Sequence, residues 1–249
     1  MKKIALITGA TAGIGEATAR RLAANYSLVI CGRRQDRLDA LKAELSNQTD
    51  IHTLSFDVRD REGVFKAIES LPAQWRSIDV LINNAGNAHG LAPIHEGSLD
   101  DWDAMIDINT KGLLYVSKAI LPGMVERKSG FVVNIGSIAG KEVYPNGNVY
   151  CASKFAVDAI TQGMRLDMNP YGIRVCSINP GLVETEFSLV RFKGDEERAK
   201  KVYSTITALT GDDVADAVEY VISRPPHVMV SDLTLLPTDQ ASATVVNRS

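Results

Sequence analysis

The sequence predicts an α/β protein built around a parallel sheet, and three observations support this prediction. Short apolar runs alternate with longer segments rich in helix-forming residues, as they do in successive βαβ units. A glycine-rich segment, residues 9–15, joins the first apolar run to the first helical segment. The chain has 249 residues, of which 45% are hydrophobic and 23% charged, and this is enough to bury a full core. We therefore expect a single domain spanning residues 1–249.

The first unit is a strand, a glycine loop and a helix. Residues 4–7 form an apolar run that ends at Thr8-Gly9, as expected for a strand buried on both faces. The loop has the spacing G-x3-G-x-G and precedes a predicted helix over residues 16–24. Such a helix N-terminus can bind a dinucleotide pyrophosphate, because glycines let the backbone approach phosphate closely. The loop lacks the Gly-Lys-Ser/Thr of a P-loop, and a glycine turn without a ligand is the alternative.

The second predicted strand, residues 27–31, ends at Gly32-Arg33-Arg34. A carboxylate at this place would bind the ribose 2′-OH of NAD, whereas arginine suits the 2′-phosphate of NADP. Asp36 lies where the next predicted helix, residues 36–45, begins, so we interpret it as a first-turn or capping acid. The alternative is a solvated arginine pair. Because the arginines follow a glycine loop and a strand, we predict NADP as the cofactor.

The third and fourth strands also end in polar residues. Residues 51–56 form an alternating run that ends at Asp57-Val58, and a helix is predicted over residues 60–71. Residues 78–82 predict the fourth strand, which continues into Asn83-Asn84-Ala85-Gly86. The two amides have two possible roles at the end of this strand: they line a pocket wall, or they hold the neighbouring strand.

The middle of the chain predicts a long helix over residues 99–124, with Ser98 as its N-cap. Asn109 is out of place inside it, because asparagine weakens a helix unless its side chain has another partner. Residues 131–135 predict the fifth strand and put Ser137 at its carboxyl end, where open α/β sheets bind ligands. A helix over residues 149–168 and a sixth strand over residues 173–178 follow.

Three side chains are predicted to converge on a reactive oxygen. Tyr150 and Lys154 are four residues apart, so on a helix they occupy the same face one turn apart. Ser137 can then hold a carbonyl oxygen while Tyr150 passes a proton to it, provided that Lys154 lowers the pKa of the phenol from its free value near ~10. The alternative is an ordinary surface pair, which is the commoner meaning of Tyr and Lys at this spacing.

The composition of the chain excludes several classes of binding partner. A net charge of -3 and the lack of a long basic run argue against nucleic acid. Three unclustered cysteines argue against a disulfide framework or a metal site, so we expect them to be reduced. The N-terminal apolar run is too short for a signal peptide or a membrane span. We expect a cytoplasmic protein with small-molecule partners and no membrane association.

These motifs together resemble those of the short-chain dehydrogenase/reductase family over nearly the whole chain. The resemblance is carried by Thr8-Gly9-x3-Gly13-Ile14-Gly15, Asn83-Asn84-Ala85-Gly86, Asn109, Ser137, Tyr150-x3-Lys154 and Pro180-Gly181. It implies a doubly wound Rossmann-type domain with a seven-stranded parallel sheet, helices on both faces of the sheet, and a homotetramer.

The resemblance also implies roles for single residues. Tyr150 would be the acid/base, Ser137 would hold the substrate oxygen, Lys154 would grip the nicotinamide ribose, and Asn109 would hold a water in a proton relay. Thr185 would bind the nicotinamide carboxamide. The residues expected at the cofactor are Gly9, Thr11, Gly13, Ile14, Gly15, Arg33, Arg34, Asp57 beside the adenine, Val58, Asn84, Ala85, Gly86, Tyr150, Lys154, Pro180, Gly181, Val183 and Thr185.

One subgroup is similar in more detail, the NADP-dependent 3-hydroxy acid dehydrogenases. The segments that carry this likeness are Gly32-Arg33-Arg34, 121–127, 186–188, 190–195 and 236–238. It implies hydride transfer at the 3-hydroxy or 3-oxo carbon of a small acid such as serine, allo-threonine, 3-hydroxypropionate or malonic semialdehyde. The alternatives are reduction of an unrelated small carbonyl compound and a dinucleotide-binding regulator without turnover.

A lid is expected over residues 182–210, because this segment follows the sixth strand and Pro180-Gly181. It carries Arg191 and Lys193 beside two phenylalanines. A hydroxy acid brings a carboxylate into a dry site, and the arginine fork matches that group best. We therefore predict Arg191 as the carboxylate anchor, with Lys193 as the second candidate, beside Ser137 and Tyr150 at the substrate. The alternative is that both cations are solvated and pair with Asp195, Glu196 or Glu197.

Overall fold

The computed structural model describes residues 2–248 and contains one seven-stranded parallel sheet. The strand order is β3-β2-β1-β4-β5-β6-β7. The strands are β1 (Lys3–Thr8), β2 (Tyr26–Gly32), β3 (Ile51–Ser55), β4 (Ile78–Asn83), β5 (Phe131–Ile135), β6 (Arg174–Pro180) and β7 (Asp232–Leu235). The order reverses between β1 and β4, which is where such sheets open a crevice at their carboxyl ends. The predicted doubly wound sheet is confirmed.

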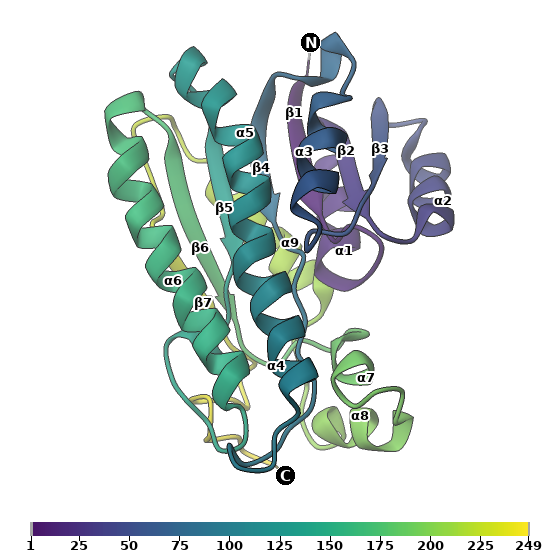
Figure 1. Ribbon diagram of the computed structural model, residues 1–249, viewed down its shortest axis with the longest axis vertical. Helices are drawn as coiled ribbons and strands as arrows, with labels where there is room; N and C mark the ends of the chain where they lie inside the picture. The colour runs from purple at the N-terminus through teal and green to yellow at the C-terminus, as the bar shows by residue number, and fades with distance from the viewer. Residues whose placement is uncertain (1, 249) are drawn as a thin grey trace.

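Helices cover both faces of the sheet. One face packs against α1 (Gly13–Leu22), α2 (Gln35–Leu45) and α9 (Gly211–Ile222), and the other against α3 (Arg61–Glu69), α5 (Leu113–Arg127) and α6 (Asn148–Met168). Figure 1 shows α5 and α6 in front of the sheet and α1 and α9 behind it. The short helices α7 (Phe187–Arg191) and α8 (Glu196–Tyr203) lie together at the same end of the molecule as the C-terminus.

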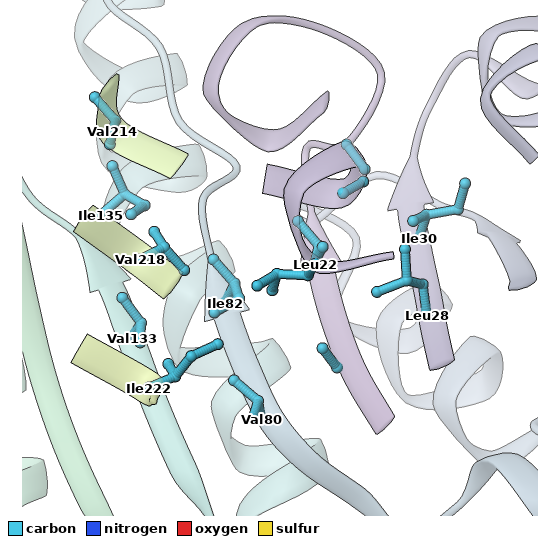
Figure 2. Packing of buried hydrophobic residues seen from close by; sticks show 14 of the residues in the cluster. Leu22, Leu28, Ile30, Val80, Ile82, Val133, Ile135, Val214, Val218 and Ile222 are labelled. Atoms are coloured by element: carbon cyan, nitrogen blue, oxygen red, sulfur yellow. The ribbon is translucent and has the colours of Figure 1, made fainter. Parts of the chain in front are cut away.

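The core has one apolar layer on each side of the sheet. In β1, Ala5 and Ile7 belong to one layer and Ile4 and Leu6 to the other, so the strand is buried on both faces as predicted. Figure 2 shows how side chains of α9 face those of β4 and β5, among them Val218 beside Ile135 and Val133. Each fully buried aliphatic side chain contributes about 1.5–3 kcal/mol. Both layers therefore hold the strand ends in fixed positions.

Helices α1 and α9 pack against each other although they lie far apart in the sequence. A Cβ on Gly211 would lie 3.1 Å from the carbonyl oxygen of Gly13, so the N-terminus of α9 approaches the glycine loop closely. Arg21 of α1 forms ion pairs with Asp216 and Glu219 of α9. Helix α9 therefore supports the glycine loop that precedes α1.

The predicted long helix over residues 99–124 is corrected by the structure. It divides into α4 (Leu99–Ile106), a π-helical turn (Asp107–Gly112) and α5. The turn places Asn109 inward, where its side chain bonds the loop after β4. Gly112 lies against Val58, since a Cβ there would be 2.7 Å from Val58 Cγ2. The predicted cap is confirmed, because the Ser98 hydroxyl accepts a hydrogen bond from the Asp101 N–H.

Candidate active site

A cavity of about 540 Å³ opens at the carboxyl ends of the strands. It is lined by the segments that follow β1, β2, β3, β4, β5 and β6, and by the segment that contains α7. Almost every residue predicted for the site lines it. The exceptions are Gly15, which lies beneath the glycine loop, and Asn109, which lies behind the wall of the cavity.

The glycine loop has the backbone that its sequence predicts. Gly9 and Gly13 have φ values of +67° and +54°, which other residues adopt only with strain. Gly15 packs so closely against the Gly9 carbonyl and the Asn84 amide that a Cβ would overlap both. The loop therefore turns tightly and leaves its backbone open toward the cavity, as a dinucleotide site requires.

The two amides after β4 hold neighbouring segments. Asn83 donates hydrogen bonds to Ser117 Oγ and Asn134 Oδ1, each at 2.9 Å. Asn84 donates to the carbonyl oxygens of Thr8, at 2.9 Å, and Gly9, at 3.2 Å. The second of the two roles left open by the sequence is thus confirmed for both side chains, and Asn84 also borders the cavity.

The arginine pair lies at the end of the cavity formed by the glycine loop and β2. Arg34 donates to Thr11 Oγ1 at 3.1 Å and to Glu186 at 3.1 Å. Arg33 is 62% exposed, and its nearest acid is Asp57 at 3.8 Å. Burial opposes ionisation of Asp57, but hydrogen bonds from Arg59 and the charge of Arg33 keep the pKa of its carboxyl lowered. Arg33 is therefore open to a further anion.

Ser137 and Tyr150 meet on one wall of the cavity. The Ser137 hydroxyl accepts from the Ala139 N–H at 3.1 Å, which fixes the serine at the start of a short turn after β5. Tyr150 lies in the first turn of α6, 8% exposed, with its ring edge-on to Phe187 at 5.7 Å. Both side chains are buried among apolar groups but border the cavity.

Lys154 lies one turn beyond Tyr150, as predicted, and is buried. Its Nζ donates to the carbonyl oxygen of Ile135 at 3.0 Å. Burial lowers the pKa of Lys154 to about 8. A Cβ on Gly86 would be 3.6 Å from this nitrogen, so the loop after β4 covers it.

The structure does not show the effect that is expected of Lys154 on the phenol, and this effect stays a prediction. Burial raises the pKa of Tyr150, and Tyr144 adds to this, whereas the Ser137 hydroxyl and the charge of Arg191 oppose it. The physical reason is that the ammonium bonds a backbone carbonyl while the phenol lies in an apolar wall. Ser137 and Arg191, and not Lys154, are the groups that favour the phenolate here.

Asn109 lies behind the wall of the cavity that contains Ser137 and Tyr150. Its amide accepts from the Asn87 N–H and donates to the Asn87 carbonyl, both at 2.8 Å. It also donates to Ser153 Oγ at 3.0 Å, and Ser153 donates to the Tyr150 carbonyl at 2.7 Å. The side chain of Asn109 thus ties the loop after β4 to the first turn of α6.

The segment of the predicted lid contacts residues at both ends of the cavity. Thr185 contacts Gly13, since a Cβ there would be 3.1 Å from the Thr185 side chain. Phe187 contacts Tyr150. Glu186 lies between these two residues and pairs with Arg34 and with Arg37, the latter at 2.7 Å.

Of the two candidate cations, Arg191 borders the cavity and Lys193 does not. The guanidinium carbon of Arg191 is 5.4 Å from the centre of the Tyr150 ring. Its Nε donates to the Gly90 carbonyl at 3.2 Å, and its Nη2 donates to the Tyr144 hydroxyl at 2.7 Å. Lys193 is exposed, as the solvated alternative expects, but it pairs with Asp101 at 3.0 Å and not with one of the acids expected for it. Arg191 does not fit this alternative.

Sequence reasoning missed three side chains of this site, Tyr144, Phe187 and Glu186. Tyr144 lies in an irregular segment between Ser137 and α6, where no spacing rule assigns it a neighbour. Phe187 and Glu186 are in the lid, and their partners come from distant segments. The one signal in the sequence was the position of Tyr144 between two residues already placed at the site.

Two structural features are absent from the described part of the chain. Within residues 2–248 there is no group of three or more His, Cys, Asp or Glu side chains arranged to hold a metal ion. No helix in this range combines the length and hydropathy needed to cross a bilayer. All three cysteines are free thiols and buried, as expected.

Comparison with known proteins gives consistent matches over the full length. The NADP-dependent 3-hydroxy acid dehydrogenase of Salmonella typhimurium is 50% identical over 242 residues, covering 96% of this chain and 97% of that protein. Sulfoacetaldehyde reductase 2 of Chromohalobacter salexigens is 45% identical over 251 residues, covering 100% of both. A solved structure, the closed form of serine dehydrogenase complexed with NADP⁺, matches with a TM-score of 0.93 and 47% identity, over 99% of this chain and 100% of that one.

The family model described as short chain dehydrogenase matches residues 3–196. This range contains the glycine loop, the arginine pair and the Ser137, Tyr150 and Lys154 side chains, and it ends within the lid. The sequence motifs, the fold and the geometry of the cavity agree with this match. The chain belongs to the short-chain dehydrogenase family.

Proposed function

We propose that the protein is an NADP-dependent oxidoreductase that transfers a hydride between the nicotinamide and the 3-hydroxy or 3-oxo carbon of a small hydroxy acid. One observation carries the proposal. A single cavity runs from the glycine loop and an arginine pair to Ser137 and Tyr150, and Arg191 lies over the ring of Tyr150 at 5.4 Å. A dinucleotide with a 2′-phosphate fits the first end, and an acidic substrate fits the second.

The residues of the first end fit NADP. Gly9 and Gly13 turn the loop without strain and open its backbone to a pyrophosphate, Arg33 and Arg34 offer guanidinium donors to the 2′-phosphate, and Asp57 borders the adenine. The relatives named as NADP-dependent or complexed with NADP⁺ support this assignment. When bound, NADP supplies the nicotinamide carbon that accepts or donates the hydride.

Proton transfer takes place at the end of the cavity that contains Ser137 and Tyr150. Ser137 holds the substrate oxygen, and the Tyr150 hydroxyl donates its proton to that oxygen during reduction or takes it back during oxidation. Lys154 would hold the nicotinamide ribose. Asn109 fixes the loop after β4 against the first turn of α6, and its place beside a relay water stays a prediction.

Arg191 would bind the acidic group of the substrate. A guanidinium forms paired, charge-assisted hydrogen bonds with carboxylates and with other oxyanions. The curated relatives are named for 3-hydroxy acids and for sulfoacetaldehyde, both of which carry an oxyanion near the reacting carbon. In our proposal Arg191 binds the acidic group of the substrate by these hydrogen bonds. We also propose that the protein is a cytoplasmic homotetramer.

The experiment follows NADPH absorbance in both directions of the reaction. Malonic semialdehyde is the substrate for reduction by NADPH. The substrates for oxidation by NADP are 3-hydroxypropionate, serine and allo-threonine. Tyr150→Phe should lower turnover about 10²–10⁴-fold while NADPH still binds, because it removes the transferable proton but keeps the ring. Tyr171→Phe, at an exposed position, is the matched control and should behave as wild type. A Tyr150→Phe enzyme that keeps more than about a tenth of the wild-type rate would contradict the general-acid role.

A dinucleotide-binding regulator is the second candidate. It would bind NADPH with the same residues but turn over none of these compounds, so the assay separates the two functions.

A further inference from the structure

Tyr144 and Arg191 form a pair at the substrate end of the cavity. Arg191 Nη2 is 2.7 Å from the Tyr144 hydroxyl oxygen, and the guanidinium carbon is 5.5 Å from the centre of the Tyr144 ring. Arginine can only donate hydrogen bonds, so the tyrosine oxygen is the acceptor. The hydrogen of the Tyr144 hydroxyl is therefore left for another acceptor, and no side chain or backbone group within residues 2–248 accepts it.

Arg191 keeps a second donor in the same place. Its Nε bonds the Gly90 carbonyl and its Nη2 bonds Tyr144. Its Nη1 has no acceptor among the described residues. Two donors, the Nη1–H of Arg191 and the O–H of Tyr144, thus border the cavity that also contains Ser137 and Tyr150.

The surroundings hold this pair in position. The backbone of Gly90 donates to the Arg191 carbonyl at 2.9 Å, so the arginine is bound through both its main chain and its side chain. Gly147 packs so closely on the ring of Tyr144 that a Cβ would overlap it. Because both groups are already ordered, a ligand that binds them loses little further conformational entropy.

We propose that Tyr144 is a substrate-binding residue whose hydroxyl, together with Arg191 Nη1, binds the oxyanion of the substrate. The ligand class is a short aldehyde or alcohol with a carboxylate or sulfonate near the reacting carbon. The inference rests on the proposed function and extends it. Two donors, the charged guanidinium of Arg191 and the neutral hydroxyl of Tyr144, would bind the acidic group together. Tyr144 also sets the direction of the guanidinium, so the acidic group is held at a fixed distance from Tyr150.

The test compares Tyr144→Phe with wild type on two substrates of the same carbon skeleton, 3-hydroxypropionate and its neutral methyl ester. The variant keeps the ring that packs on Gly147 and loses only the hydroxyl. We expect KM for 3-hydroxypropionate to rise about tenfold to a hundredfold, the range for a lost hydrogen bond to a charged group. The turnover number and the Kd for NADPH should stay within about threefold, and the ester should show no change in KM.

Inhibition by unreactive acids checks the same pair in a second way. Propionate and ethanesulfonate, which cannot react, serve as competitive inhibitors, and their Ki values report the carboxylate and the sulfonate separately. Both Ki values should rise in Tyr144→Phe and in Arg191→Ala, and the double variant should lose less than the product of the two effects, because the residues act as a unit. Tyr171→Phe should leave them unchanged.

The outcomes separate this inference from the proposed function. Equal losses on the acid and the ester, or a weaker NADPH complex, would mean that Tyr144 only supports the fold, and the inference would be overturned. If wild type turns over no hydroxy acid but reduces a neutral carbonyl compound, and propionate or ethanesulfonate inhibits that reaction through Tyr144, the proposed substrate fails and the oxyanion site stands. Unchanged Ki values in Tyr144→Phe would overturn the oxyanion site itself.

Discussion

A buried lysine is the most costly single group of the site. Lys154 is a buried residue of α6, with a carbonyl oxygen as its hydrogen-bond partner. Water solvates an ammonium far better than one carbonyl does, so burial favours the neutral amine and lowers the pKa from 10.5 to about 8. The side chain therefore weakens the fold at neutral pH.

This penalty predicts a difference in pH dependence between wild type and Lys154→Met. Below the folded pKa both states carry the proton and the full penalty is present. Between about pH 8 and pH 10.5 the unfolded state binds more protons, so the stability of wild type rises with pH. Relative to Lys154→Met, the free energy of unfolding of wild type should rise by about 2–3 kcal/mol from pH 7 to pH 10.

Urea unfolding of the cofactor-free proteins at four pH values measures this difference. The exposed Lys66→Met is the control and should run parallel to wild type. Parallel curves for Lys154→Met as well would show that the ammonium is not buried in solution.

The arginine pair predicts cofactor preference. Arg33 is largely exposed beside the cavity, so a 2′-phosphate can reach it, and a charge-assisted contact contributes about 1.5–3 kcal/mol. Arg33→Asp should therefore weaken NADP about tenfold to a hundredfold and favour NAD through its ribose hydroxyls. The ratio of kcat/KM for the two cofactors is the measurement, with the exposed Arg61→Asp as control. Equal wild-type efficiency with NAD and NADP would refute the assignment.

We expect the contacts of the predicted lid to control how the cofactor leaves. Glu186 stands between Thr185 and Phe187 and forms ion pairs with Arg34 and Arg37 of the segment after β2. These pairs join the lid to the opposite side of the cavity. The arginines and the acid are about 40% exposed, so each pair contributes no more than about 0.2–1 kcal/mol.

Glu186→Gln should therefore speed NADPH dissociation by about two- to tenfold. The wild-type rate should also rise with salt, because ions screen exposed pairs, whereas the variant should respond less. Stopped-flow displacement of NADPH at low and high salt measures both effects. Glu197→Gln, on the exposed face of α8, should match wild type. A slower release in Glu186→Gln would mean that the acid repels the cofactor instead of holding the lid.

Elements with regular apolar patterns were predictable from the sequence, and irregular ones were not. The run at residues 131–135 predicts β5 (Phe131–Ile135) without error, because all five side chains are buried. Strand β7 gave no run that the sequence analysis could assign, since its residues alternate between exposed and half-buried. The π-helical turn at Asn109 depends on bonds to Asn87 and Ser153, and such distant partners leave no periodic signal.

At the scale of the whole molecule, the parallel sheet explains why so much of the site could be predicted. Parallel strands end at one edge, so residues that follow β1, β2, β4, β5 and β6 meet there although they are distant in sequence. The pairings across the cavity were not predictable, because Tyr144 with Arg191 and Glu186 with Arg34 depend on how two loops and the lid are placed. The order of the strands determines where the site residues lie, whereas the conformation of the loops determines which side chains pair across the cavity.

The packing of α1 on α9 also has a consequence for synthesis. Arg21 and its partner Glu219 are separated by 198 residues, so α1 leaves the ribosome long before the helix that covers it. At about 5–20 residues per second the delay is roughly 10–40 s, during which Ala19 and Leu22, buried in the finished protein, have no partner from α9. We expect the nascent chain to require protection from aggregation in this interval, and the glycine loop to take its final form only after translation is nearly complete.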